Sequence, residues 1–310
     1  MSESQRGLLP YLAFVGLGLI WGMSFLFFKL GVQDMSPTVL VFVRSASGAA
    51  ALALIMWLSR RALFGGSWRE RAVHFVIMGV TNAVIPWTAI AWGEQSISSG
   101  LASILNATTP FWTALFIFFV IPAERPTALN YAGVLLGIVG VVILVIPDIS
   151  EHGLSGNVFG ALAVVVASMS YAVSALYQRA RLRGMDVFQQ SLGQLVGSSV
   201  IAFPLAAPFL PQVHLTFVSM GAVLALGALG SGVAYLLYYY TMNTLGPVRA
   251  TGVTFIVPIT AVFWGIVLLD ESLTLPIVVG MIVILAGIVL TNMRKRPTVR
   301  QVAREEEEVA

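Results

Sequence analysis

The sequence predicts an all-α integral membrane protein, with ten transmembrane helices arranged as two inverted five-helix repeats. The first observation behind this prediction is composition: 58% of the 310 residues are hydrophobic, 10% are charged, and the mean hydropathy is +0.90. So few charges could not cover the surface of a soluble globular protein. The second observation is that the second half repeats the first, with an odd number of apolar runs in each copy. An odd-numbered repeat places its second copy upside down in the membrane, as in many transporters.

About 20 apolar residues are needed for a helix to cross the hydrocarbon core of a bilayer. Ten runs have about this length, and the loops between them are too short to hold a soluble domain. The runs cover residues 8–31, 37–58, 72–93, 99–121, 128–146, 157–178, 187–208, 216–240, 248–269 and 274–292. They divide the chain into a first repeat at 8–146, a second repeat at 157–292 and a cytoplasmic tail at 293–310.

The register of the repeat is set by residues that recur at a nearly constant distance. Pro110 recurs as Pro258, Glu124 as Glu271, Gly133 as Gly280 and Gly140 as Gly287. The separation is 148 residues for the proline and 147 for the other three, so one residue has slipped between them. The two copies therefore place Glu124 and Glu271 on opposite faces of the membrane, which favours structural roles for both.

Basic residues predict the orientation, because Lys and Arg concentrate in cytoplasmic loops. With the N-terminus in the cytoplasm, 15 of the 17 basic residues fall on the cytoplasmic side. The outer loops then carry acids only, namely Asp34, Glu94, Asp148, Glu151, Asp270 and Glu271. Both termini are therefore expected in the cytoplasm.

These features resemble the drug/metabolite transporter superfamily, and in particular bacterial proteins with two EamA-type repeats. The resemblance rests on Ile20 to Phe25, on Ser36 to Arg44, and on the paired segments Pro110–Gly140 and Pro258–Gly287. It covers about residues 10 to 292. It implies a cavity surrounded by helices 1, 3, 4, 6, 8 and 9, with helices 5 and 10 packed together at the periphery. It also implies a multi-pass protein of the bacterial inner membrane that exports amino acids or other small metabolites.

Polar and aromatic side chains within the spans predict the wall of this cavity, because polar groups in the bilayer core are costly unless they face protein or water. The alternative for each is packing or a hydrogen bond between helices. The predicted substrate-binding residues are Trp21, Ser24, Asn82, Trp87, Ser103, Asn106, Tyr171, Ser174, Tyr235, Tyr238 and Thr254. Such amide, hydroxyl and aromatic groups would suit a small amphipathic solute.

A second group of residues is predicted to gate the cavity or to line an outer vestibule. Lys29 and Arg44 are the two cations placed within spans, where they either reach the outer headgroups or attract carboxylates. Pro110 and Pro258 predict bends, because a proline inside a helix removes one backbone hydrogen bond. Trp92 lies near the outer end of helix 3 and is either a gate residue or part of the aromatic belt.

The sequence does not contain the residues that several classes of chemistry require. The chain has no cysteine, no P-loop, no catalytic triad and no metal-binding cluster, so no cofactor and no enzymatic activity are expected. No Asp, Glu or His lies in the middle of a span, which predicts transport without a buried carboxylate as proton site. The basic loop at 60–71 is explained by topology and anionic lipid, so no nucleic-acid partner is expected.

The sequence therefore predicts a transporter that exports small metabolites, with amino acids as the expected class, by alternating access through a central cavity. Its expected partners are a small-molecule substrate and the lipid bilayer, and the protein is a monomer or a weak homodimer. A lipid-linked sugar flippase is one alternative. An intramembrane lipid-phosphate enzyme is another, but it would need clusters of carboxylates or histidines at membrane depth.

Overall fold

The computed structural model describes residues 3–63, 68–120, 127–152, 156–182, 184–214, 216–245, 250 and 252–293. Within these residues the chain is helical and contains no strand. Nine helical segments are long and apolar enough to cross a membrane, and α13 adds a shorter one. Glu124 and the tail from residue 294 onward lie outside the described residues.

The first half supplies five spans. They are α1 (Glu3–Gly31), α2 (Pro37–Leu58), a third span of α3 (Trp68–Gly79), η1 (Val80–Val84) and α4 (Ile85–Gly93), a fourth of α5 (Ser99–Asn106) and α6 (Thr109–Val120), and α7 (Ala128–His152). The predicted runs match these spans within a few residues. The fourth departs from one continuous helix, because α5 ends at Asn106 and α6 restarts at Thr109.

The second half repeats this order. It contains α8 (Gly156–Arg181), α9 (Val187–Ala206) followed by the 3-10 turn η2 (Ala207–Gln212), an eighth span of α10 (Phe217–Gly227), η3 (Ala228–Val233) and α11 (Ala234–Leu245), then α13 (Val253–Leu269) and α14 (Leu275–Asn292). The third and eighth spans each carry a π-helical segment, η1 and η3, at matching positions. The two copies therefore share an irregularity that hydrophobic periodicity does not reveal.

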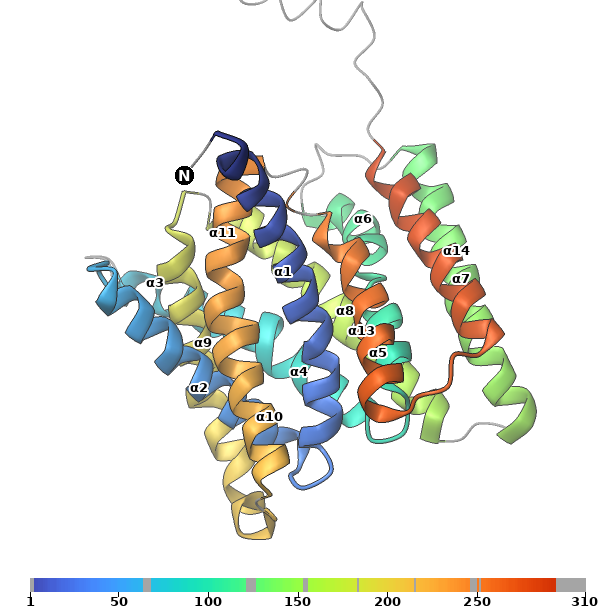
Figure 1. The fold of residues 1–310 in the computed structure, drawn as a ribbon, viewed down its shortest axis with the longest axis horizontal. Helices are drawn as coiled ribbons and strands as arrows, with labels where there is room; N and C mark the ends of the chain where they lie inside the picture. The colour runs from blue at the N-terminus through green and yellow to red at the C-terminus, as the bar shows by residue number, and fades with distance from the viewer. Residues whose placement is uncertain are drawn as a thin grey trace, which may run out of the picture.

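The two halves run in opposite directions. In Figure 1 the third span descends from α3 to α4, whereas its counterpart ascends from α10 to α11. The start of α1 and the end of α14 lie on the same side of the molecule, at the top of Figure 1. The inner side below means this side, and the outer side means the opposite one, following the orientation that the basic residues predict.

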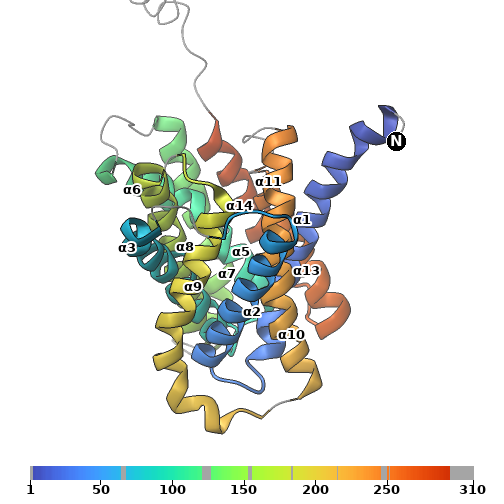
Figure 2. The same ribbon diagram turned by 90° about the vertical axis from the view of Figure 1, so that its left-hand side faces the viewer.

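Contacts between helices follow the repeat. α1 packs on α13, and its counterpart α8 packs on α6 and α5; α2 pairs with its own counterpart α9. Figure 2 shows α2 and α9 side by side at one edge of the bundle. Each element of one half therefore has the neighbours that a two-fold relation to the other half requires.

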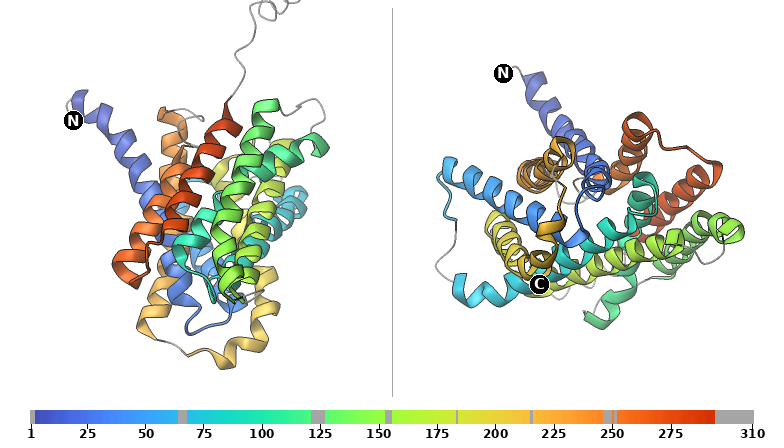
Figure 3. Two further views of the ribbon diagram at one scale, coloured as in Figure 1. Left: turned by 90° about the vertical axis from the view of Figure 1, so that its right-hand side faces the viewer. Right: turned by 90° about the horizontal axis from the view of Figure 1, so that it is seen from below.

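The helices α7 and α14 form a pair at the opposite edge, as the view from below in Figure 3 shows. Their backbones approach so closely that a Cβ on Gly133 would lie 2.7 Å from the carbonyl oxygen of Gly287. A Cβ on Gly140 would lie 3.2 Å from the carbonyl oxygen of Gly280. The glycines that define the sequence repeat are thus the contact surface of this pair, which confirms the expected packing of helices 5 and 10.

Candidate functional site

A cavity of about 400 Å³ lies where the two halves meet. Helices of both halves form its wall: α1, η1, α4, α5 and α6 from the first, and α8, η3, α11 and α13 from the second. These are the six spans that were expected to surround a cavity, and α2 adds one residue, Arg44. The predicted residues that line it are Trp21, Ser24, Asn82, Trp87, Ser103, Asn106, Pro110, Tyr171, Tyr235, Tyr238, Thr254 and Pro258. Their part in substrate binding stays a prediction.

Three predicted residues lie elsewhere. Ser174 is fully buried against α3, where its hydroxyl donates to the sulfur of Met78 at 3.5 Å, so it serves helix packing. Trp92 is 49% exposed and is absent from the cavity wall, as a residue of the lipid-facing surface would be. Lys29 lies beyond the cavity, in the outer contact described below.

Arg44 was expected in an outer vestibule, and the structure places it in the wall of the central cavity instead. Its side chain is only 7% exposed. The guanidinium carbon lies 3.7 Å from the centre of the Trp87 ring and 4.8 Å from that of Phe28. The Nε atom is buried and has no hydrogen-bond partner. Arg44 therefore supplies a positive charge that two aromatic faces hold in place.

No Asp, Glu or Lys is found among the residues described in the cavity wall, so nothing there balances the charge of Arg44. Cations in a low-dielectric site attract anions far more strongly than they do in water. Arginine also matches the geometry of a carboxylate, with two parallel N–H groups. The wall is therefore suited to a solute that carries a carboxylate or another planar anion.

Besides Arg44 Nε, two further polar atoms among the described residues of the wall have no partner of their own. The Oδ1 atom of Asn106 and the hydroxyl of Ser231 are buried and without hydrogen bonds. In contrast, Ser24 donates to the carbonyl of Ile20, and Ser103 to that of Gly100, within their own helices. An unsatisfied buried acceptor such as Asn106 Oδ1 costs free energy unless a ligand or water pairs with it. It could accept a hydrogen bond from an ammonium group.

Two residues of the cavity wall, Asn82 and Tyr235, are held in place by hydrogen bonds to a residue behind the wall. The amide of Asn82 donates to Gln194 Oε1 at 3.1 Å, and Gln194 Nε2 donates to the hydroxyl of Tyr235 at 2.8 Å. Gln194 lies on α9 and is only 3% exposed. The sequence analysis missed it, although a glutamine inside an apolar span is itself a signal of a buried polar contact.

Aromatic residues form a further part of the wall. The rings of Trp21 and Tyr238 lie 5.6 Å apart, and Trp21 Nε1 donates to the carbonyl of Gly230 at 3.2 Å. That carbonyl belongs to η3, where the π-helical turn rearranges the backbone bonding. Such bulges are frequent at functional sites. Here the two bulges carry Asn82 and Ser231 into the cavity wall.

The prolines of the two repeats act differently. Pro110 follows the break between α5 and α6, where the hydroxyl of Ser168 bonds the carbonyls of Leu105 and Asn106. Pro258 lies inside the continuous helix α13. A bend was predicted at both prolines. In the first copy the helix is interrupted just before Pro110, whereas in the second copy the helix continues through Pro258. A role in gating stays a prediction for both.

On the outer side of the cavity lies a group of contacts that we call the outer seal, formed by Lys29, Glu94, Ile97, Ser99 and Glu271. The ammonium of Lys29 donates to the carbonyls of Glu94 and Ile97, at 2.5 and 2.8 Å. The carboxylate of Glu271 accepts from the backbone N–H groups of Ser99 and Gly100, at 2.6 and 3.1 Å. The seal thus ties α1 and the end of α13 to the α4–α5 connection.

Glu94 is the unexpected member of this seal. The sequence analysis placed it in an outer loop, and it does follow the last residue of α4, Gly93. Its side chain is nevertheless 0% exposed, and both carboxylate oxygens lack a hydrogen-bond partner. Burial raises the pKa of Glu94 well above its usual range, against the lowering effect of Lys29 and with a further raising effect of Glu271. Glu94 is thus a buried carboxylate at the end of a span, whereas the sequence analysis considered only the middle of each span; transport without a buried carboxylate as proton site stays a prediction.

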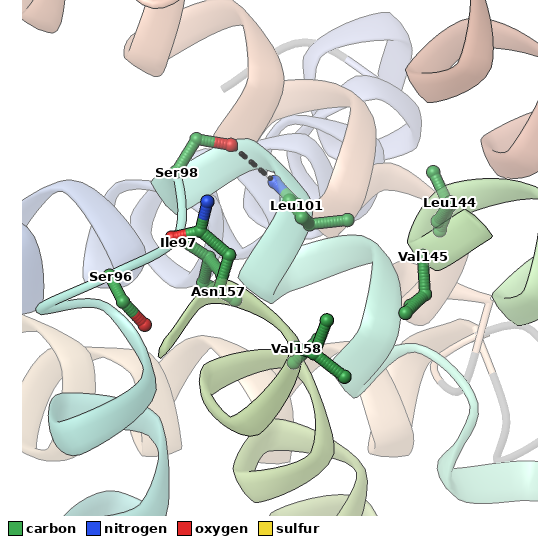
Figure 4. A pocket seen from close by; sticks show the side chains of 9 residues that line it. Ser96, Ile97, Ser98, Leu101, Leu144, Val145, Asn157 and Val158 are labelled. Atoms are coloured by element: carbon green, nitrogen blue, oxygen red, sulfur yellow. Dashed lines mark hydrogen bonds between the residues drawn. The ribbon is translucent and has the colours of Figure 1, made fainter. Parts of the chain in front are cut away.

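A smaller recess of about 170 Å³ lies beside the outer seal (Figure 4). It is lined by Ser96, Ile97, Ser98, Leu101, Leu144, Val145, Asn157, Val158 and Ala161. None of these carries a charge, and Ser98 caps α5 through the N–H of Leu101. Among the described residues there is also no group of three potential metal ligands.

Sequence comparison decides the family. The model of the EamA-like transporter family matches residues 8–146 and 158–293. The chain belongs to this family. This EamA-like transporter contains two copies of the family's repeat and is a multi-pass membrane protein.

Relatives of the EamA-like transporter extend over nearly its whole length. An uncharacterized transporter of Bacillus subtilis, YoaV, is 24% identical over 283 residues, covering 91% of this chain and 96% of the relative. The uncharacterized inner membrane transporter YedA of Escherichia coli is 26% identical over 302 residues, covering 94% of this chain and 93% of the relative. A solved crystal structure with 19% identity superposes with a TM-score of 0.65, over 99% of this chain and 100% of the other. That likeness concerns the fold alone.

Proposed function

We propose that this EamA-like transporter exports amino acids across the bacterial inner membrane, by alternating access through the central cavity. The observation that carries the proposal is Arg44, a buried guanidinium in a cavity wall whose described residues include no acid. The family and the relatives' names support transport in general, and they favour a transporter over an enzyme. The name of YedA supports an inner-membrane location.

The wall matches the parts of an amino acid. Arg44 would bind the carboxylate, and Asn106 Oδ1 would accept from the ammonium. Trp21 and Tyr238 offer aromatic surface to an apolar side chain. A volume of about 400 Å³ is large enough for a bulky amino acid with some water, since pockets of 300–1,000 Å³ commonly hold small ligands.

Alternating access is proposed from the position of the outer seal. The seal joins elements of both halves on the outer side of the cavity, and we infer that exchange with that side requires Lys29 and Glu271 to leave their backbone partners. With the orientation that the basic residues predict, this conformation would load its substrate from the cytoplasm. We propose that one chain is the transport unit, as a monomer or in a weak homodimer, because a single chain builds the whole cavity.

The test is uptake and efflux of labelled amino acids in proteoliposomes, after a toxicity screen with amino-acid analogues in overexpressing cells. We expect resistance to some analogues, and loss of at least about 90% of transport in Arg44→Gln, because removing a charged hydrogen bond costs about 1.5–3 kcal/mol. Arg44→Lys keeps the charge but not the paired N–H geometry, and should retain an intermediate rate.

The matched control is Arg61→Gln, which removes an exposed arginine near Asp186 on the inner side. It should transport at the parent rate. Transport of an amino-acid ester or amide as well as of the free acid would contradict the role of Arg44. Transport of a lipid-linked sugar with no response to any amino acid would favour a flippase.

A further inference from the structure

The buried carboxylate of Glu94 has no part in the proposed binding of substrate. It lies one helical turn beyond Ile90, which lines the outer end of the cavity. Close packing brings it inside the protein, because Gly93 leaves room for α8: a Cβ on Gly93 would lie 2.7 Å from the carbonyl oxygen of Gly160. A carboxylate in such a position is costly as an anion and is stable once it binds a cation or a proton.

The neighbouring groups decide between these two ligands. A metal ion would need several oxygen ligands around it. The nearest candidates are the carbonyls of Glu94 and Ile97, and the ammonium of Lys29 already bonds both. The oxygens of Glu271 are likewise engaged, by the N–H groups of α5. The site thus has a fixed cation in place of a free set of ligands, and both oxygens of the Glu94 carboxylate remain without a partner, as does the neutral hydroxyl of Ser99.

The charges around Glu94 come from two of the elements packed on it. Lys29 of α1 contributes one positive charge, and Glu271, at the end of α13, contributes one negative charge. From α8, Gly160 packs on Gly93, the residue before Glu94, and on α5 the hydroxyl of Ser99 lies beside Glu271, since a Cβ on Gly265 would meet both; neither residue titrates. On α2 the nearest charge is Arg44, which lies against Trp87, two turns deeper along α4. A proton on Glu94 makes the net charge of the Lys29, Glu94 and Glu271 cluster zero.

We propose that Glu94 is a proton-binding site of the outer seal, occupied when the seal is closed and emptied to the external water when the seal opens. The protein then has a second ligand besides its substrate. Because the closed form binds this proton more tightly, acid holds the outer side closed and alkali favours its opening. This dependence on pH is expected above pH 4.5, which is the ordinary pKa of a glutamate side chain. A tenfold difference in proton affinity between the two forms shifts their ratio up to about tenfold.

The test measures opening directly and needs no substrate, so it stays decisive even if amino acids are not the substrate. The chain has no cysteine, so Gln33→Cys and Gln95→Cys can carry one spin label each without background. Both side chains are exposed, one after α1 and one after α4, on either side of the Lys29 contact. Pulsed electron paramagnetic resonance in lipid nanodiscs then gives the distance distribution from pH 5 to pH 9.

In the doubly labelled parent we expect one short distance at pH 5, and a longer one whose share rises about tenfold relative to the short one by pH 9. Glu94→Gln should keep the short distance at every pH, whereas Glu94→Asp keeps a carboxyl and should still respond to pH, with a shifted midpoint. Asp270→Asn is the matched control, because it removes an exposed acid at the same end of α13. It should respond as the parent does.

Two results would overturn the proposal. One is a parent whose distances do not change with pH. The other is a Glu94→Gln protein that responds as the parent does, which would assign the response to another group. A misfolded Glu94→Gln protein would be recognised by its elution profile, and the Glu94→Asp protein then decides: a shifted midpoint supports the proposal, and an unchanged one contradicts it.

Discussion

The guanidinium carbon of Arg44 lies 3.7 Å from the centre of the Trp87 ring, so that an aromatic face covers the cation in the cavity wall. This contact joins α2 to α4 within the first half of the chain. It fixes the plane of the guanidinium, and with it the direction in which its N–H groups meet a bound anion.

Replacing Trp87 tests this contact. Trp87→Leu should weaken binding of a transported amino acid by about 2- to 30-fold, as expected from a cation–π contribution of about 0.5–2 kcal/mol. Trp87→Phe retains an aromatic face and should lose less. Equilibrium binding of labelled substrate to the purified protein measures the effect. Trp57→Leu, at a position 68% exposed, is the control. Equal losses in the Leu and Phe variants would show that the Trp87 ring acts only by its size.

The chain of Asn82, Gln194 and Tyr235 gives a second prediction. Gln194→Leu leaves an amide and a phenol hydroxyl without their partner, at about 1–3 kcal/mol for each buried group that stays unpaired. We expect a lower thermal midpoint in detergent and a raised KM. Tyr235→Phe removes one bond only and should cost less. Gln212→Leu, on the exposed turn η2, should leave both quantities unchanged. If the KM rises while the thermal midpoint is unchanged, the hydrogen bonds of Gln194 serve only to position Asn82 and Tyr235.

The glycine contact between α7 and α14 predicts a loss of stability with no direct effect on the cavity. Gly133→Ala would force its methyl group against the backbone of Thr291 and Gly287, and such overpacking costs about 1–3 kcal/mol. The thermal midpoint should fall, while the affinity for substrate stays the same. Gly221→Ala is the control, because a Cβ there meets no atom within 4 Å. An unchanged midpoint in Gly133→Ala would contradict the tight approach of the two helices.

The carboxylate of Glu271 caps α5 from the other half of the protein. Glu271→Ala removes the acceptor for the N–H groups of Ser99 and Gly100, and losing a helix cap costs about 0.5–2 kcal/mol. Hydrogen exchange of the peptide that contains these two amides should become faster, and Glu271→Gln should give an intermediate rate. Exchange at the start of α14 serves as an internal reference. Unchanged exchange at Ser99 and Gly100 would remove Glu271 from the outer seal.

The sequence predicted the spans well because each is set by a local property, the length of its apolar run. It also predicted much of the cavity wall, since polar groups such as Asn82 and Asn106 have few stable positions in a bilayer other than a cavity. It misplaced Arg44, because its position along α2 suggested the outer end of a helix, while the fold turns its side chain toward Trp87.

The burial of Glu94 and the contacts of Gln194 could not be predicted from local sequence properties. Glu94 has the sequence context of a loop residue, and its burial depends on α8 and α1, which pack on α4. Gln194 is one of several polar residues in α9, and only the fold shows that it lies between Asn82 and Tyr235. The π-helical turns η1 and η3 likewise depend on backbone bonding that apolar periodicity does not record.

The contacts of Gly133 with Gly287 and of Gly140 with Gly280 are exchanged by the repeat itself, because Gly280 is the copy of Gly133 and Gly287 the copy of Gly140. That exchange is the mark of an isologous interface between identical subunits. The seam between α7 and α14 therefore has the form of a homodimer contact inside a single polypeptide. Two separate copies of such a five-helix repeat would bury this same surface against each other in antiparallel orientation.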